Sequence, residues 1–259
     1  MDAATALRAR LNDGGRAYGT MAFEFFTPGL TALLRQAGCE FVLLDTEHSG
    51  VGIETIKQQV AFARGLGIAV WVRPPAKTYA HVATLLDAGA DGIMVPMLET
   101  PEEARELVEW ARYRPEGKRG CAFGFAQEGY RAVGAVEAQK AANDRVALIG
   151  LIETKKGLEN AEAILATPGM DIGWMGHFDM SDDFGMPGRF DDPVMIRAFE
   201  GLANAAKNTG KTAASADVDM AFMKAQVERG YRCLGYGVDV AVLRAAMSRG
   251  IADLKALHG

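Results

Sequence analysis

Two carboxylic acids that could hold a metal ion follow apolar runs in the second half of the chain. Glu153 ends the run VALIGLIE, and Asp179 lies just beyond IGWMGHF. Hard divalent ions such as Mg²⁺ and Mn²⁺ prefer oxygen ligands, and two protein carboxylates leave several positions for water and substrate. Such a site would accept the carboxylate and ketone oxygens of a 2-oxo acid. Taken singly, each acid could instead cap a helix or pair with an arginine.

An arginine and a histidine in the first third of the chain could complete this chemistry. Arg73 ends the apolar run AVWVR before two prolines. Its planar guanidinium can bind a carboxylate or an enolate oxygen and stays charged during turnover. An ion pair with Asp45 or Glu47 is the compatible structural alternative. His48 follows LLDTE, where a neutral imidazole held by a carboxylate could act as a general base.

The other histidines have less defined contexts. His177 could approach the metal edge, or it could pack beside Trp174 and Phe178, as buried histidines commonly do. His81 is expected on a solvated helix face and His258 in the tail. We therefore keep only His177 as a second candidate site residue.

The elements that must position these residues follow an alternating pattern. Short β-branched and aromatic runs each precede a longer segment with apolar residues at helical spacing, which predicts a parallel sheet. The predicted strands are Tyr18–Phe23, Phe41–Asp45, Ala69–Arg73, Gly92–Met97, Val146–Glu153, Ile172–His177, Thr212–Ser215 and Arg232–Gly237. Eight such strands predict a closed (β/α)8 TIM barrel with an N-terminal and a C-terminal helix. Its active site is expected at the carboxyl ends of the strands.

That rule separates rim residues from ordinary surface polar residues. The polar residues that follow predicted strands are Asp45, Glu47, His48, Arg73, Glu153, Asp179, Ser215 and Asp239. In the fourth strand–helix unit, Thr100 is a residue type that caps a helix and Pro101 is one that commonly begins a helix. The segment from Gly117 to Asn143 is longer than a usual connection between a helix and a strand. We interpret it as an insertion that could cover the site.

Composition restricts the class of protein. The 259 residues are 49% hydrophobic and 24% charged, with a formal charge of −5, which predicts one globular domain over residues 1–259 and no nucleic-acid partner. No apolar run is long enough for a membrane span, and the N-terminal segment has no signal-peptide core, so we expect a cytoplasmic protein. Cys39, Cys121 and Cys233 are distant from one another in sequence. Reduced, buried thiols are therefore expected rather than disulfides or a zinc site.

At these residues the chain resembles the HpcH/HpaI family of metal-dependent pyruvate aldolases, which includes 4-hydroxy-2-oxoheptanedioate and 2-dehydro-3-deoxyglucarate aldolases. The resemblance covers nearly the whole chain. It is carried by the segments LLDTEH, VRPP, LLDAGADGIMVPML, IET and GHFDMS. Together these segments are specific, although each is weak alone.

The resemblance implies a role for each matching residue. Glu153 and Asp179 would bind Mg²⁺, Mn²⁺ or Co²⁺, Arg73 would contact pyruvate and its enolate, and His48 would act as base. Asp45 would support the same hydrogen-bond network. Asp87 would reach His48 from an adjacent subunit of a hexamer built as a trimer of dimers, with the last helix, Val240 to His258, exchanged between partners. Within one subunit, Asp87 could merely cap the turn after the helix Tyr79–Leu86.

Three positions depart from the family pattern and concern the substrate pocket. Leu151 replaces a common Gln, His177 replaces the Pro of G-P-x-D-L-S, and Met21 lies where a Trp often lines the entrance. The candidate substrate-binding residues are Phe23, Arg73, Leu151, His177 and Ser215. Together with Phe25 and Phe26, the departures predict a less polar acceptor side than in sugar-acid aldolases.

The predicted activity is reversible cleavage of a 4-hydroxy-2-oxo acid into pyruvate, or a close 2-oxo acid, and an aldehyde. One alternative is a metal-dependent decarboxylating or carbon–carbon lyase acting on a larger aromatic partner. Another is a Schiff-base aldolase using Lys155 or Lys156, although rim-exposed, cationic lysines are the simpler interpretation. A non-catalytic binder of 2-oxo acids is the third.

Overall fold

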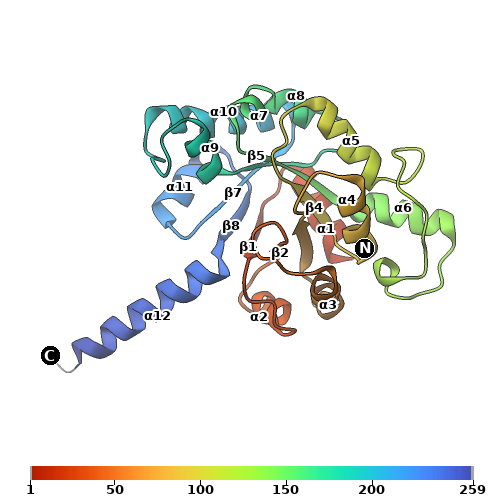
Figure 1. Ribbon diagram of the computed structural model, residues 1–259, viewed down its shortest axis with the longest axis horizontal. Helices are drawn as coiled ribbons and strands as arrows, with labels where there is room; N and C mark the ends of the chain where they lie inside the picture. The colour runs from red at the N-terminus through yellow and green to blue at the C-terminus, as the bar shows by residue number, and fades with distance from the viewer. Residues whose placement is uncertain (1, 258–259) are drawn as a thin grey trace.

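The computed structural model describes residues 2–257 as a closed barrel of eight parallel strands in sequential order. The strands are β1 (Ala17–Ala22), β2 (Phe41–Asp45), β3 (Ala69–Arg73), β4 (Gly92–Val95), β5 (Ala147–Ile152), β6 (Ile172–Met175), β7 (Thr212–Asp217) and β8 (Cys233–Val238). The predicted (β/α)8 architecture is confirmed. Figure 1 shows the strands at the centre and the helices around them.

The helices surround and close the barrel. They are α1 (Ala3–Asn12), α2 (Leu30–Gln36), α3 (Ile53–Ala63), α4 (Tyr79–Asp87), α5 (Pro101–Ala111), α6 (Ala135–Arg145), α7 (Lys155–Glu159), α8 (Ala161–Ala166), α9 (His177–Asp183), α10 (Pro193–Thr209), α11 (Met220–Arg229) and α12 (Asp239–Ala256), with a 3₁₀ turn, η1, at Ala126–Glu128. As its sequence predicts, α5 begins with Pro101 after Thr100, whose hydroxyl accepts the N–H of Glu103 at 3.2 Å.

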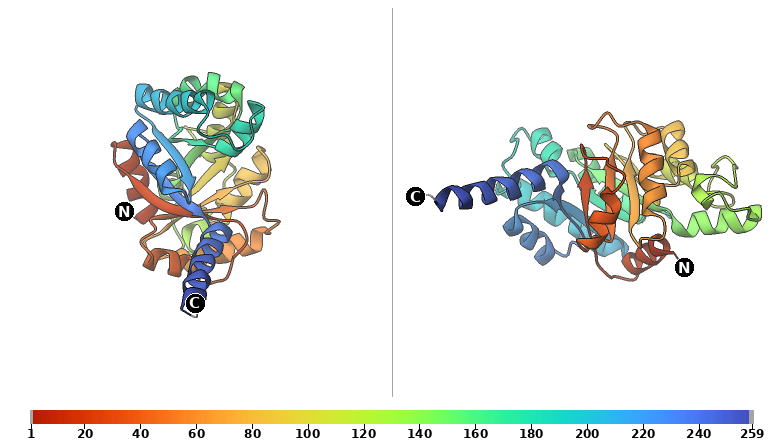
Figure 2. Two further views of the ribbon diagram at one scale, coloured as in Figure 1. Left: turned by 90° about the vertical axis from the view of Figure 1, so that its left-hand side faces the viewer. Right: turned by 90° about the horizontal axis from the view of Figure 1, so that it is seen from below.

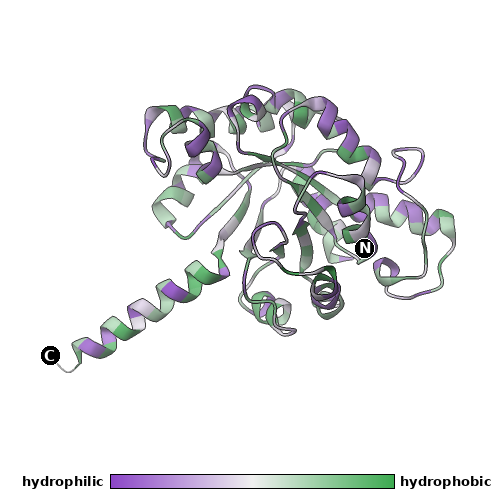
Figure 3. Cartoon of the chain, in the orientation of Figure 1, coloured by the Kyte–Doolittle hydropathy of each residue, from purple (hydrophilic) through white to green (hydrophobic). Residues whose placement is uncertain are grey.

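Two apolar layers form the core, as the period-two alternation of strand side chains requires. Inside the barrel, Phe41 stacks on Trp71 with ring centroids 4.4 Å apart, and Leu7 and Leu11 of α1 close the amino-terminal end. Outward-facing residues such as Val42 and Leu44 pack against the surrounding helices. Hydrophobic residues accordingly concentrate on the strands in Figure 3.

Two strands next to the site, β4 and β6, end two residues before their predicted ends. β4 ends at Val95 because Pro96 follows and Met97 has a left-handed φ of 50°. β6 ends at Met175, and His177 begins α9 instead of ending the strand. Met97 and His177 therefore belong to the segments that follow these strands at the carboxyl end of the barrel.

The insertion from Gly117 to Asn143 does not cover the mouth within the subunit. It follows α5 and precedes β5, and connections from a helix to the next strand lie at the amino-terminal end of a parallel barrel. Gln127, Gly129 and Arg131 accordingly line a separate cavity at that end, and no residue of the insertion lines the mouth pocket. The expectation of a covering loop is therefore wrong for a single subunit.

The last helix, α12, leaves the barrel after β8 and extends away from it (Figures 1 and 2). None of its residues is buried. It runs from Asp239 to Ala256, whereas the sequence predicted a helix from Val240 to His258. Residue 258 lies outside the described residues. Within residues 2–257, no helix is long and apolar enough to cross a membrane.

The thiols differ in environment. Cys233 is buried, Cys39 is partly buried and Cys121 is exposed. All three are free, as expected, but Cys121 corrects the expectation that each would be buried. It lies in the long connection before α6, where the backbone runs over the surface.

Candidate active site

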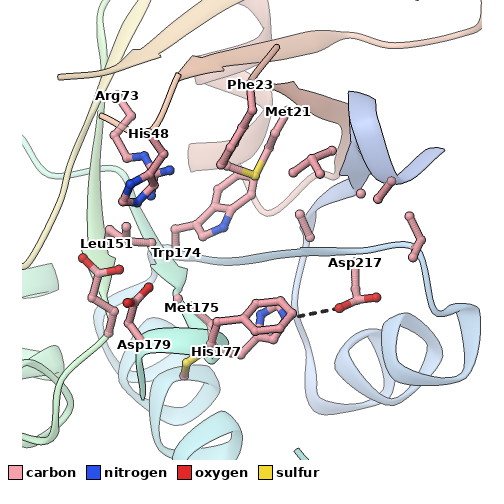
Figure 4. A pocket seen from close by; sticks show the side chains of 18 of the residues that line it. Met21, Phe23, His48, Arg73, Leu151, Trp174, Met175, His177, Asp179 and Asp217 are labelled. Atoms are coloured by element: carbon pink, nitrogen blue, oxygen red, sulfur yellow. Dashed lines mark hydrogen bonds and ion pairs between the residues drawn. The ribbon is translucent and has the colours of Figure 1, made fainter. Parts of the chain in front are cut away.

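A pocket of about 530 Å³ opens at the carboxyl ends of the strands and brings together most of the predicted site residues. The predicted residues that line it are Phe23, His48, Arg73, Leu151, Glu153, His177 and Asp179. Figure 4 shows Arg73 and His48 on one side of this pocket and Asp179 and His177 on another. Met21 also lines it, at the entrance position noted in the sequence.

Glu153 follows β5 and is held by the loop after β4. The residue is 4% exposed, and its Oε1 accepts the main-chain N–H of Met97 at 2.7 Å. Gly176 leaves room for it, since a Cβ there would lie 2.6 Å from the Cβ of Glu153. Burial raises the pKa of Glu153 to about 7, with the negative charge of Asp179 adding to the effect and the Met97 N–H opposing it. A nearby cation would relieve this penalty.

Asp179 lies in the first turn of α9 and is exposed to the pocket. Among residues 2–257 its carboxylate has no hydrogen-bond partner, and Oε2 of Glu153 has none either. Within residues 2–257, no group of three or more His, Cys, Asp or Glu is arranged to hold a metal ion. The two carboxylates with free oxygens fit a hard divalent ion that has two protein ligands and leaves its other positions open for water and substrate.

Arg73 ends β3 and points into the pocket with its side chain 7% exposed. Its Nε forms a close ion pair with the fully buried Asp45 and lies 3.2 Å from Oε2 of Glu47. The guanidinium carbon lies 5.2 Å from the centroid of the Phe23 ring. The ion-pair interpretation thus holds together with exposure to the pocket, and the two acids fix the guanidinium beside the metal-ligand candidates.

His48 lies in the loop after β2, and its main-chain N–H donates to Oδ1 of Asp45 at 2.6 Å. The side chain is 59% exposed, and Nε2 lies 3.6 Å from Oε2 of Glu47. Burial raises the pKa of Glu47, while Arg73 and His48 lower it in part. The imidazole is thus accessible to a bound substrate and has only a loose carboxylate partner inside its own subunit.

His177 both lines the pocket and packs among aromatic rings, so the structure combines the two alternatives. Its ring centroid lies 4.6 Å from that of Phe178, 4.7 Å from Phe190 and 4.9 Å from Phe222. Its Nε2 lies 3.1 Å from Oδ2 of Asp217, the contact drawn in Figure 4.

Asp217 holds this histidine as a charged partner. Burial alone would raise the pKa of Asp217, but hydrogen bonds from His177 and the Asp219 amide outweigh it and leave that pKa below its usual value. The ionised carboxylate fixes the imidazole beside Phe178 at the outer part of the pocket.

Other predicted residues are not brought to the pocket. Ser215 is fully buried, and its hydroxyl has no partner among residues 2–257. Its neighbours Ala214 and Ala216 face the barrel interior, so strand alternation directs Ser215 toward the helices. This placement corrects the expectation that Ser215 contacts substrate.

Asp239 has a structural role at the rim. Its carboxylate accepts the N–H groups of Phe23, Glu24 and Phe25 at 2.8–3.1 Å and thereby fixes the loop after β1. Asp87, at the end of α4, pairs with Arg119 at 2.6 Å and does not line the pocket of its own subunit.

The two lysines after β5 also lie outside the pocket lining. Lys155 lies over the ring of Phe184, with Nζ 5.3 Å from its centroid, and Lys156 pairs with Glu99 at 3.2 Å. A Schiff-base nucleophile would have to contact the substrate carbonyl. This arrangement therefore disfavours the lysine mechanism.

Several residues that line the pocket were not among the predicted site residues, and three of them have side chains that bear on its chemistry. Trp174 forms part of its floor, Asp217 holds His177, and Arg244 enters from α12. Asp217 was missed because β7 extends two residues beyond its predicted end at Ser215. Arg244 gave no signal because it lies on a helix that was expected to pack elsewhere.

Known proteins resemble the chain over nearly its full length. A hydroxypyruvate/pyruvate aldolase of Chromohalobacter salexigens is 32% identical, with 94% of this chain and 95% of that protein aligned. A 5-keto-4-deoxy-D-glucarate aldolase of Shigella boydii is 30% identical over 87% of each chain. The crystal structure of an HpcH/HpaI aldolase from Desulfitobacterium hafniense superposes with a TM-score of 0.91 at 32% identity, covering 96% of both chains.

The family model agrees with these similarities. The model described as HpcH/HpaI aldolase/citrate lyase matches residues 23–246, which include every residue that lines the mouth pocket except Met21. Aldolases and citrate lyases make and break carbon–carbon bonds. This chain therefore belongs to the HpcH/HpaI aldolase/citrate lyase family and is a carbon–carbon lyase.

Proposed function

We propose that the protein is a class II pyruvate aldolase that reversibly cleaves a 4-hydroxy-2-oxo acid into pyruvate, or a close 2-oxo acid, and an aldehyde. The observation that carries this proposal is the convergence of Glu153, Asp179, Arg73 and His48 on one pocket. Relatives named as hydroxypyruvate/pyruvate and keto-deoxy sugar acid aldolases support the reaction class.

The donor half of the substrate is bound between the acids and the arginine. Glu153 and Asp179 would hold Mg²⁺, Mn²⁺ or Co²⁺, which as a Lewis acid would stabilise negative charge on the substrate oxygens. Arg73, fixed by Asp45 and Glu47, donates hydrogen bonds to the C2 oxygen as it becomes an enolate oxygen. Preorganised charge of this kind is commonly the largest single contribution to rate.

His48 accepts the proton of the C4 hydroxyl, directly or through a water molecule, as the C3–C4 bond breaks. The C4–O bond becomes the aldehyde carbonyl, and the electron pair of the broken bond moves into the enolate of pyruvate. Protonation of the enolate at C3 then gives pyruvate. The exposed position of the imidazole at the pocket is compatible with this proton transfer.

The acceptor aldehyde would lie toward α9 and β7. Leu151, Trp174 and Phe178 give this side an apolar surface, and the His177–Asp217 pair contributes its polar part. We propose a preference for short aliphatic or aromatic aldehydes over polyhydroxylated ones, since unpaired hydroxyl groups are costly against apolar walls.

We further propose a homohexamer, assembled as a trimer of dimers, in which α12 packs on a partner. Apolar residues recur on α12 at intervals of three or four and are exposed in the single subunit: Val240, Leu243, Met247, Ile251 and Leu254. Figure 3 shows hydrophobic patches along this projecting helix. Such a stripe normally packs against another element. Asp87 would approach the His48 of a neighbouring subunit in the same assembly.

A pyruvate-release assay tests the proposed activity. Metal-stripped protein, reloaded with Mg²⁺, Mn²⁺ or Co²⁺, is offered a panel of 4-hydroxy-2-oxo acids. The proposal expects pyruvate to appear only with metal and to stop on adding a chelator. Trapping of a pyruvate adduct by borohydride in the metal-free protein would instead support a lysine mechanism, and no release from any substrate would support a non-catalytic binder.

A further inference from the structure

A second cavity, of about 520 Å³, lies at the opposite end of the barrel from the mouth pocket. Its walls come from the ends of α3 and α6, from the loops after α3 and α4, from the long connection before α6, and from the first turn of α1. The charged residues that line it are Asp2, Arg64, Asp91, Arg131 and Arg145. None of them has a role in the reaction proposed above.

The three arginines of this cavity retain most of their hydrogen-bonding capacity. Arg64 has no hydrogen bond or ion pair among residues 2–257. Arg131 donates from Nε to the carbonyl of Glu128 at 3.0 Å. Arg145 donates from NH1 to the carbonyl of Gln127 at 2.9 Å, and its buried Nε forms only an ion pair with Asp91, at 3.4 Å. An arginine has five N–H donors, so several remain free.

Arg64 is positioned by glycines rather than by a polar partner. A Cβ on Gly129 would lie 2.7 Å from NH1 of Arg64, and one on Gly89 would lie 3.0 Å from NH2. Both glycines have positive φ angles, of 67° and 101°. The guanidinium therefore lies against two stretches of backbone that only glycine leaves open, next to the cavity.

The two acids of the cavity already have partners. Asp91 accepts the N–H of Val70 at 3.0 Å, and its other oxygen lies 3.4 Å from Nε of Arg145. Asp2 caps α1 by accepting the N–H of Thr5 at 2.8 Å. The amino terminus of α1, which faces the same cavity, carries a partial positive charge.

The pKa of Arg64 agrees with an excess of positive charge in this cavity. Burial lowers the pKa of Arg64, and the positive charges of Arg145 and Arg131 lower it further, against the opposing effect of Asp91. Like charges held near one another are stabilised by an anion between them. Guanidinium groups with free N–H pairs recognise phosphate oxygens especially well.

We propose that this cavity is a binding site for a small phosphorylated metabolite, whose phosphate group is held by Arg64, Arg131 and Arg145. The site is separate from the aldolase pocket and does not depend on the proposed reaction. The long connection before α6 contributes Arg131 and Gly129 to it. That connection does not cover the active site of its own subunit. In this proposal it forms one side of the phosphate site instead.

Calorimetric titration of the intact, metal-free protein with inorganic phosphate tests this site. We expect saturable binding of one phosphate per subunit, which weakens as sodium chloride is added. The double substitution Arg64→Gln and Arg131→Gln should weaken binding by about tenfold or more, because charge-assisted hydrogen bonds are lost. Both side chains are exposed, so the fold should persist, as circular dichroism can verify.

Arg16→Gln is the matched control. Arg16 is exposed just before β1, at the same end of the barrel, and does not line the cavity. This variant should bind phosphate as the parent protein does. Absence of saturable binding in the parent would overturn the proposal. So would equal affinity in the double variant, which would place the phosphate elsewhere, for example at Arg73.

Discussion

The main-chain N–H of Met97 donates to Oε1 of Glu153 at 2.7 Å and thereby joins the loop after β4 to the acid after β5. Met97 makes this contact from a left-handed backbone conformation, with φ at 50°, which is uncommon for a residue with a side chain. The contact orients one carboxylate oxygen and leaves the other free for a metal. It does not offset burial and the charge of Asp179, which together raise the pKa of Glu153 to about 7.

Metal binding is therefore expected to depend on pH in the neutral range. Below the raised pKa, Glu153 is mostly protonated, and a proton must leave before the metal binds. Apparent affinity should fall by up to about tenfold per pH unit below about pH 7 and should level off above it. Calorimetry at about pH 6 and about pH 8, in buffers of different ionisation enthalpy, measures both affinity and proton release. Equal affinity at the two pH values, without proton release, would refute this dependence.

Replacing Arg73 with Lys keeps the charge but removes the planar fork. We expect kcat/KM for aldol cleavage to fall by about 10²-fold or more, because the enolate oxygen loses a fixed donor. Hydrogen exchange at C3 of pyruvate should decline in parallel, since it passes through the same enolate. Arg105→Lys, on the exposed face of α5, is the control. Near-normal kinetics in Arg73→Lys would mean that Arg73 serves only in a structural ion pair with Asp45.

Acceptor preference tests the apolar side of the pocket. Short aliphatic and aromatic aldehydes should compete well in the aldol direction, and Phe178→Ala should reduce the advantage of aromatic ones, because Phe178 lines the pocket. Phe62→Ala, on an exposed part of α3, should leave the preference unchanged. Relative kcat/KM values over an aldehyde panel give the answer. A strong preference for a polyhydroxylated acid aldehyde would show that the apolar description of the pocket is wrong.

Activity is expected to require two subunits at each site. His48 has only a loose contact with Glu47 in its own chain, and Asp87 lies with Arg119 outside its own pocket. If Asp87 acts on a neighbour, then His48→Ala and Asp87→Ala subunits, each impaired alone, should regain activity when co-assembled. Hybrid composition is verified by mass. Purified hybrids as inactive as their parents would mean that Asp87 does not act across the interface.

The barrel was predictable from the sequence because most strands are short apolar runs that end at, or just before, a polar residue, glycine or proline. β2 and β3 have the predicted bounds. Because the barrel aligns the strand ends, the sequence also indicated that Arg73, Glu153 and His48 belong to one pocket. The direction in which a strand residue points was less predictable. Ser215 and Ala216 are adjacent on β7, yet only Ala216 lines the pocket.

Contacts between distant segments explain the remaining differences. The partnership of His177 with Asp217 depends on β6 and β7 being neighbours and on where β7 ends. The placement of Gly117 to Asn143 depends on its being a connection from a helix to a strand, which sets it at the end of the barrel away from the mouth. Arg244 reaches the pocket because α12 begins at the rim after β8.

The most direct test of the account is a calorimetric titration of Mn²⁺ into the metal-free parent, Glu153→Ala and Asp179→Ala proteins, with Glu106→Ala, on the exposed face of α5, as control. The account predicts that the parent and Glu106→Ala bind one metal ion per subunit. Both site variants should lose measurable binding and metal-dependent pyruvate release, while their circular dichroism spectra stay unchanged. Parent-like metal affinity in both site variants would contradict the assignment of Glu153 and Asp179 as metal ligands.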